Sequence, residues 1–171
     1  QAIPKLIDLS QDLGETVNLA ELSGDHIIYV SRLPCKRTYF AATVIGRRLP
    51  ALSTSGGRAM IATFPPEERE AAIRTWPLKA FTSQTTLDRD SIRDSINIAV
   101  EKGYAISSGQ MILSEIGVAC PITGPSGRAF AAVQCSVSAH TWTHARVEAE
   151  ILPRLQDTAN AISPSSQAHR R

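Results

Sequence analysis

The sequence IGVACPITGPSGRAFAAVQCSVS, residues 116–138, decides the fold. Two apolar runs flank Thr-Gly-Pro-Ser-Gly, a combination that is typical of a tight turn between antiparallel strands. The second run, residues 128–138, is largely apolar at both odd and even positions. A strand of this kind has to be covered on both faces, so we predict that it lies in the interior of a sheet.

This second run also carries polar side chains at positions where burial is expected. Because side chains alternate along a strand, one face carries Ala129, Ala131, Val133, Cys135 and Val137, and the other carries Phe130, Ala132, Gln134, Ser136 and Ser138. A buried amide or hydroxyl without a partner costs about 1–3 kcal/mol, so Gln134 and Ser136 need hydrogen bonds. Their partners are either neighbouring side chains or a ligand, for which the small Gly117 and Ala119 leave room.

The rest of the chain alternates between helical and extended patterns. Helices are predicted before Gly14, after Gly57, from Pro66, over 88–102 and over 143–163 with a kink at Pro153, and strands over 16–22, 26–33, 38–44 and 104–107. Successive hairpins indicate an antiparallel sheet, whose faces the helices must cover. The fold class is therefore α+β.

The segment LPALSTSGGRAMIA, residues 49–62, joins extended chain to a predicted helix. Small hydroxyl residues and glycines at a helix start can form a backbone cradle for an anion, because the first amides have no partner within the helix. The same residues also suit a plain turn with a capped helix. The local sequence leaves both interpretations open.

Composition excludes several classes of protein. The chain has 171 residues with 43% hydrophobic and 20% charged residues, which fits one globular domain, and no apolar run approaches the ~20 residues of a membrane span. The net charge is only +2, without the basic stripe of a nucleic-acid-binding surface. We therefore expect neither membrane nor direct nucleic-acid contact from this segment.

The chain has no sequence motif for a cofactor or a metal. His140 and His144 are four residues apart but lie at a predicted loop-to-helix junction, so we expect no metal site and no cofactor. The three cysteines are widely spaced and odd in number, which favours a reducing compartment and predicts a cytoplasmic location.

Four segments, in this order, resemble the effector-binding domain of the IclR family of bacterial transcriptional regulators. They are ETVNLAELSGDHIIYVSRL, IGRRLPALSTSGGRAMIATFPPEER, the pair EKGYAISSGQ and GVACPITGPSGRAFAAVQCSVS, and the closing helix. The resemblance implies a GAF-like (profilin-like) domain over residues 1–163, with a solvated tail at 164–171. It also implies a non-enzymatic sensor of a small organic acid, for which the candidates are an aromatic acid, a dicarboxylic acid or an acid of the β-ketoadipate pathway. Such a sensor forms dimers or tetramers and contacts DNA only through an N-terminal winged helix-turn-helix, which this chain lacks.

The resemblance also implies the residues of the site. The amides of Ser55, Gly56 and Gly57 would hold the carboxylate of the effector, and the lining positions would be Thr38, Leu49, Gln134 and Ser136. This sequence has Ser107, Gln110 and Gly117 where the family commonly has an acid, a glutamate and a cysteine. Ser107 and Gly117 therefore predict a larger and less acidic pocket.

Two alternative functions remain. One is a structural dimerisation domain whose pocket is filled by its own side chains, and the other is a GAF-like reductase that uses a cysteine thiolate. Such an enzyme would use Cys35, Cys120 or Cys135. It requires an exposed thiol with a low pKa and a resolving partner. Strand parity counts against it, because Cys120 and Cys135 point away from the face that carries Gly117 and Gln134.

Overall fold

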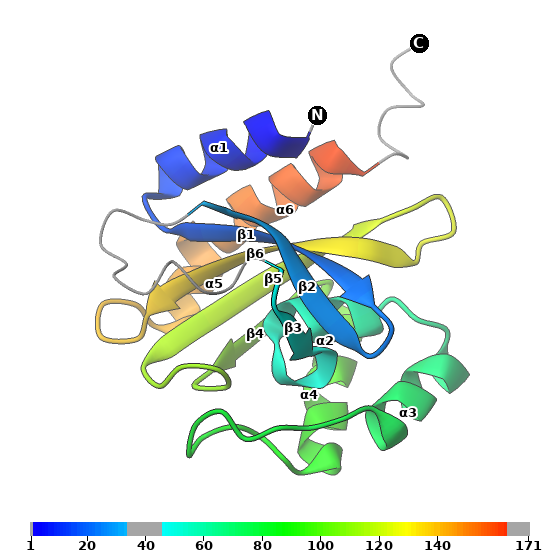
Figure 1. The fold of residues 1–171 in the computed structure, drawn as a ribbon. Coiled ribbons are helices and arrows are strands. Elements are labelled where there is room, and N and C mark those ends of the chain that lie inside the picture. Colours follow the sequence, from blue (N-terminus) through cyan, green and yellow to red (C-terminus); the bar gives the residue numbers. More distant parts are fainter. Residues whose placement is uncertain (1, 34–45, 164–171) are drawn as a thin grey trace.

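The computed structural model describes residues 2–33 and 46–163, which form one six-stranded antiparallel sheet with helices on both faces (Figure 1). The strands are β1 (Thr16–Ser23), β2 (His26–Leu33), β3 (Arg48–Pro50), β4 (Ala105–Ser108), β5 (Glu115–Thr123) and β6 (Ala129–Ser138). Their order across the sheet is β3-β2-β1-β6-β5-β4. This order confirms the α+β prediction and places the apolar strand inside the sheet, between β1 and β5.

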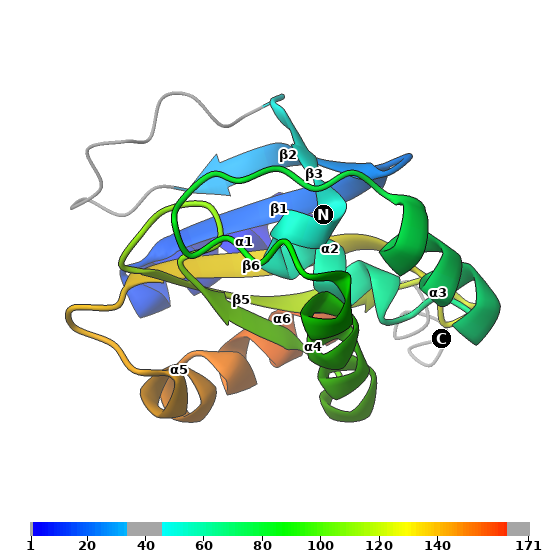
Figure 2. The same ribbon diagram turned by 90° about the horizontal axis from the view of Figure 1, so that it is seen from below.

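Two helical layers cover the sheet. One face carries α1 (Ala2–Leu13), α5 (His144–Glu150) and α6 (Leu152–Ile162), and the other carries η2 (Ala51–Ser53), α2 (Ser55–Ile61), α3 (Pro66–Thr75) and α4 (Arg89–Lys102). Figure 2 shows α2 lying across the central strands, with α3 and α4 outside it. Within residues 2–33 and 46–163, no helix combines the length and the apolar character needed to cross a membrane.

Several helix boundaries follow the predicted signals. Gly14 has a φ of 65° directly after α1, and Gly103 has a φ of 80° directly after α4. Asp88 caps the start of α4 by accepting hydrogen bonds from the amides of Asp90 and Ser91. These positions confirm that local capping chemistry sets the ends of the two helices.

Other boundaries differ from the prediction. The helix expected after Gly57 begins at Ser55, because the Thr54 hydroxyl accepts the Gly57 amide at 2.9 Å and caps the helix earlier. The predicted last helix is two helices that meet at Ile151, since Pro153 occupies the first turn of the second one. The strand predicted over 38–44 and the tail at 164–171 lie outside the described residues.

Two glycines allow α2 to approach its neighbours closely. A Cβ atom on Gly57 would lie 2.0 Å from the carbonyl oxygen of Ala51, which no side chain can tolerate. A Cβ atom on Gly56 would lie 3.7 Å from the Cβ of Ala20 and 3.9 Å from that of Ala132, which are ordinary contacts. Glycine is therefore required by packing at position 57 but not at position 56.

We expect these two glycines to respond in opposite ways to replacement by alanine. Gly57→Ala should lower the free energy of unfolding by about 1–3 kcal/mol, because the backbone around Ala51 must shift. Gly56→Ala should leave it unchanged or raise it by up to about 1 kcal/mol, because alanine favours the helix. Urea denaturation of both variants measures the difference, and equal stabilities would contradict this packing.

Candidate functional site

Two neighbouring cross-strand rows on the α2 side of the sheet carry most of the predicted site residues. Residues that pair across antiparallel strands place their side chains on the same face. One row contains Ala119, Gln134, Asn18 and Arg32, from β5, β6, β1 and β2. The adjacent row contains Ser107, Gly117, Ser136 and Thr16, from β4, β5, β6 and β1. The sheet therefore brings Ser107, Gly117, Gln134 and Ser136 together, as predicted.

A chain of hydrogen bonds connects these rows. The Asn18 side-chain amide donates to Oε1 of Gln134 at 2.9 Å, and Nε2 of Gln134 donates to Oγ of Ser136 at 3.0 Å. Ser136 in turn is hydrogen bonded to the Glu115 carboxylate. Neighbouring side chains therefore supply partners for Gln134, which is the first of the two alternatives that the sequence left open.

The hydrogen bonding of the site is nevertheless incomplete. Within the described part of the chain, Asn18 Oδ1, Ser53 Oγ, Ser55 Oγ and Arg32 Nε are buried without any hydrogen-bond partner. Buried polar atoms of this kind are rare, and each costs about 1–3 kcal/mol. These four atoms belong to η2, the start of α2 and the strands β1 and β2, and each would gain from a hydrogen-bond partner outside the protein.

Ser55 connects α2 to the sheet at this point. A Cβ atom on Gly117 would lie 3.0 Å from Ser55 Oγ and 3.3 Å from Gln134 Nε2. The absence of a side chain at Gly117 thus lets Ser55 and Gln134 approach each other. The sequence predicted instead that Gly117 opens the wall of a larger pocket, but Ser55 takes up that space.

The three predicted cradle amides differ in availability. The Gly57 amide already donates to Thr54 Oγ1 at 2.9 Å, so the prediction that it binds a carboxylate is wrong. The amides of Ser55 and Gly56 have no acceptor among the described residues. Since α2 has only seven residues, its dipole adds little, and the donors that remain available here are two amides and the Ser55 hydroxyl.

The remaining predicted residues are Leu49, Ser107 and Thr38. Within the described residues, neither Leu49 nor Ser107 is hydrogen bonded to the start of α2. Leu49 is buried in β3, where it pairs with Ile27 in the apolar cluster on the α2 side. Ser107 is half-buried at the edge of the row that contains Gly117. Thr38 lies outside the described residues.

Sequence reasoning missed three polar residues of this face, namely Asn18, Arg32 and Glu115. Burial raises the pKa of Glu115, while its hydrogen bond with Ser136 and the charge of Arg32 partly oppose this rise. The prediction of a less acidic site rested on Ser107 alone and did not include this carboxyl. Asn18 could have been predicted from the sequence, because it is a polar residue inside an apolar strand, like Gln134.

Arg58 adds a buried positive charge to α2. Its Nε donates to the carbonyl of Leu52 at 2.7 Å, and its Nη2 donates to Oε1 of Gln110 at 3.0 Å. No carboxylate among the described residues forms an ion pair with it, and burial lowers its pKa to about 10. The guanidinium stays charged at neutral pH, so this helix favours an anion nearby.

The cysteines with described positions lie on the other face of the sheet. Cys120 and Cys135 are buried in the apolar cluster that packs against α1 and α6. Burial raises the pKa of Cys120 to about 12, so its thiol stays protonated at neutral pH. Cys35 lies outside the described residues. In the described part of the chain, no three His, Cys, Asp or Glu side chains gather as metal ligands.

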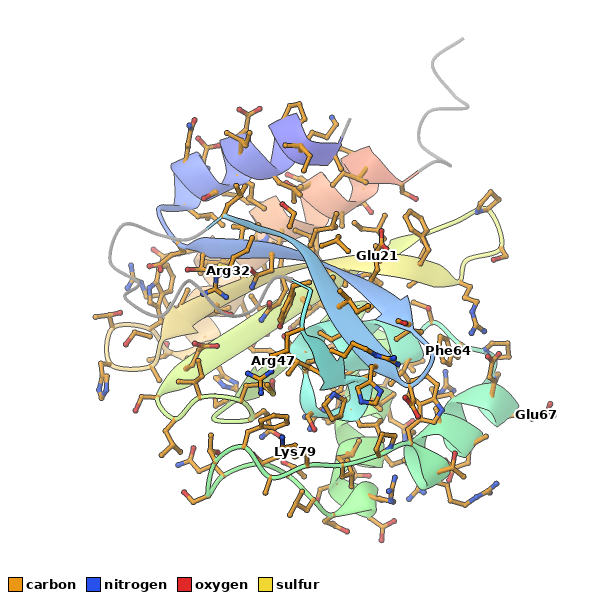
Figure 3. The ribbon with its side chains drawn as sticks, viewed as in Figure 1. Glu21, Arg32, Arg47, Phe64, Glu67 and Lys79 are labelled. Carbon is orange, nitrogen blue, oxygen red and sulfur yellow. The ribbon has the colours of Figure 1, made fainter. Side chains whose placement is uncertain are left out.

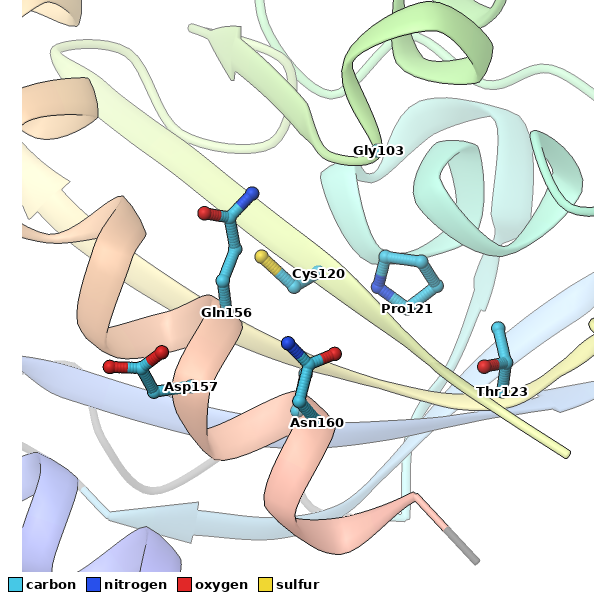
Figure 4. Close-up of a pocket in the computed structure, with 8 residues that line it drawn as sticks. Gly103, Cys120, Pro121, Thr123, Gln156, Asp157 and Asn160 are labelled. Atoms are coloured by element: carbon cyan, nitrogen blue, oxygen red, sulfur yellow. The ribbon is translucent and has the colours of Figure 1, made fainter. Parts of the chain in front are cut away.

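A surface pocket of about 430 Å³ lies on this other face (Figure 4). It lies between β5 and α6 and is lined by Gly103, Cys120, Pro121, Thr123, Gln156, Asp157, Ala159 and Asn160. None of the predicted ligand-binding residues contributes to it, whereas Cys120, a candidate of the reductase alternative, does. The pocket is thus a separate concavity and serves below as the alternative location for a ligand.

We expect the Cys120 thiol to resist alkylation in the folded protein. Its high pKa and its burial leave almost no thiolate at pH 8, whereas unfolding restores an ordinary thiol. Peptide mapping after iodoacetamide treatment, with and without 6 M guanidinium as the denatured control, measures the modification of Cys120. Rapid labelling of Cys120 in the native protein would favour the reductase alternative.

Comparison with known proteins agrees with this architecture. The family model described as "Bacterial transcriptional regulator IclR C-terminal" matches residues 1–164. The Pca regulon regulatory protein of Pseudomonas putida is 31% identical over 155 residues, which are 90% of this chain and 53% of that protein. The chain spans about half the length of the curated relatives that it matches.

Solved structures share the fold. The Thermotoga maritima IclR structure superposes with a TM-score of 0.88 at 24% identity, covering 96% of this chain and 66% of that chain. An IclR homologue from Microbacterium hydrocarbonoxydans, complexed with 4-hydroxybenzoate, gives a TM-score of 0.82 at 24% identity, covering 98% and 67%. Because the family model covers nearly the whole sequence, this chain belongs to the IclR family of bacterial transcriptional regulators and corresponds to their C-terminal, effector-binding domain.

Proposed function

We propose that this domain senses a small organic acid with an aromatic ring, bound between the start of α2 and the polar rows of β5, β6 and β1. The acid would regulate transcription through the longer protein to which such a domain belongs. Ser55 and Gly56 would hold its carboxylate, and Gln134 and Ser136 would lie along its length.

The observation that carries this proposal is the set of buried, unpaired polar atoms at the contact between α2 and the sheet. Ser55 Oγ has no partner and lies where Gly117 and Gln134 meet. The amides of Ser55 and Gly56 are also without acceptors among the described residues. A carboxylate accepts several hydrogen bonds at once, so it would satisfy this group of donors.

The charge of Arg58 supports a negatively charged ligand, and a similar protein supports an aromatic one. The Pseudomonas putida relative is named for the pca regulon, and the Microbacterium hydrocarbonoxydans structure contains 4-hydroxybenzoate. The 4-hydroxybenzoate of the second protein supports an aromatic acid as the effector of this chain. Benzoate and 4-hydroxybenzoate are therefore the first compounds to test.

We further propose that the longer protein acts in the cytoplasm, contacts DNA through a winged helix-turn-helix outside this chain, and forms dimers or tetramers. The symmetry of regulatory DNA sites supports an even number of subunits, because paired half-sites match a protein with a two-fold axis.

Gly56→Asp should abolish binding of 4-hydroxybenzoate, because it adds a negative charge at the start of α2, where the ligand carboxylate would bind. The new side chain would face the buried Ala20 and Ala132, so circular dichroism is needed to show that the variant is folded. Gly56→Ala is the matched control: its Cβ makes only ordinary contacts with Ala20 and Ala132, so the domain keeps its packing. Isothermal titration calorimetry on both variants measures the affinity. Unchanged binding in Gly56→Asp would place the acid elsewhere.

Gln134→Leu should weaken binding by about 1–3 kcal/mol, because the amide that orders Asn18 and Ser136 is lost. The matched control is Gln156→Leu, which makes the same replacement in the pocket between β5 and α6. A larger effect of Gln156→Leu would instead identify that pocket as the ligand site.

The oligomer proposal predicts a mass of at least two subunits for this chain at high micromolar concentration. Light scattering coupled to size-exclusion chromatography measures the mass. A monomer at that concentration would contradict self-association through this domain.

A further inference from the structure

The buried Asn18 and the partly buried Arg32 each have a buried polar atom without a hydrogen-bond partner among the described residues. They are directly opposite on β1 and β2, so their side chains share a face with Cβ atoms about 5 Å apart. Asn18 Oδ1, an acceptor, and Arg32 Nε, a donor, are both buried without a partner among the described residues. Asn18 itself is only 2% exposed.

The existing contacts fix the direction of the Asn18 side chain. Its Nδ2 donates to Gln134 Oε1 at 2.9 Å, so Oδ1 is the end of the amide that remains available. The Gln134 amide is held in turn by Ser136 at 3.0 Å. Rotating the Asn18 amide by 180° would break the hydrogen bond to Gln134. Oδ1 therefore remains an acceptor without a donor among the described residues.

One chemical group satisfies an unpaired acceptor and an unpaired donor together. A hydroxyl donates one hydrogen bond and accepts others, so it can donate to Asn18 Oδ1 and accept from Arg32 Nε. A second carboxylate fits poorly, because it cannot donate to Asn18. In addition, the Glu115 carboxyl already lies within electrostatic reach of Arg32 and partly offsets its charge.

The distance to the carboxylate end suits a single ring. Ser55 lies over Gly117 and Gln134, and Arg32 is two strands away from Gln134 across the sheet. Two strand spacings are about 10 Å, which one aromatic ring with a group at each end can bridge. Figure 3 shows Arg32 towards the end of the sheet that is far from α3.

We propose that Asn18 and Arg32 form a subsite that recognises a hydroxyl group on the aromatic acid, opposite the carboxylate held at Ser55 and Gly56. This inference rests on the proposed function, since it concerns the far end of the same ligand. It assigns specificity to two residues that the family resemblance did not point to. The effector class becomes a hydroxylated aromatic acid, in preference to a simple or a dicarboxylic one.

The test compares three probes by calorimetry: 4-hydroxybenzoate, benzoate and the dicarboxylate terephthalate. We expect the domain to bind 4-hydroxybenzoate about tenfold or more tightly than benzoate, and terephthalate less tightly than 4-hydroxybenzoate. In Asn18→Leu and in Arg32→Met, the ratio between 4-hydroxybenzoate and benzoate should fall towards one. Two variants are used, with thermal unfolding as a check, because Asn18→Leu also removes the bond to Gln134.

Ser55→Ala is the control at the other end of the ligand. It should weaken both 4-hydroxybenzoate and benzoate by a similar factor and leave their ratio unchanged. A ratio near one in the unmodified domain, or a ratio that survives in both Asn18→Leu and Arg32→Met, would overturn the hydroxyl subsite while the acid-sensing function stands. Failure of all three probes to bind would overturn the proposed aromatic acid and the subsite together.

Discussion

The close approach of α2 to the sheet is the constraint on which the rest of the site depends. Gly57 allows the first turn to pack on the Ala51 carbonyl, and Gly56 meets only the methyl groups of Ala20 and Ala132. This contact brings Ser55 over Gly117, where no side chain intervenes. A bulkier residue at Gly57 or Gly117 would separate the helix from the polar strands.

The polar rows below α2 lower the stability of the fold, and the packing of the core does not require them. An apolar core would be more stable than one that contains Asn18, Gln134 and Ser136 with unpaired atoms around them. The hydrogen bonds among Asn18, Gln134 and Ser136 fix the direction of both amides. The unpaired acceptor Asn18 Oδ1 therefore has a defined position. Such an incomplete network suits a sensor, because binding of the ligand supplies the missing bonds and stabilises the bound conformation.

Local chemistry made much of the fold predictable. The apolar alternation of 128–138 predicted a central strand, and Asp88 and Gly103 marked the ends of α4. The early start of α2 was not predicted, because Thr54 and Ser55 are equally good caps by residue type and only the hydrogen bond to Gly57 distinguishes them.

The candidate site was predictable in part. Gln134 and Ser136 stood out as polar residues in an apolar strand, and Asn18 could have been found by the same criterion. Arg32 and Glu115 could not, because their places follow from strand register, including an irregularity between Leu19 and Ala20 that the sequence does not announce. The occupied amide of Gly57 likewise depends on a cap geometry that only the structure provides.

The central claim is that an aromatic acid binds on the α2 side of the sheet. A titration of the ¹⁵N-labelled domain with 4-hydroxybenzoate, followed by NMR, tests it most directly. We predict that the largest shifts fall on the amides of Ser55, Gly56 and Gly117. Shifts confined to Gln156, Asp157 and Asn160, in the pocket on the opposite face, would contradict it.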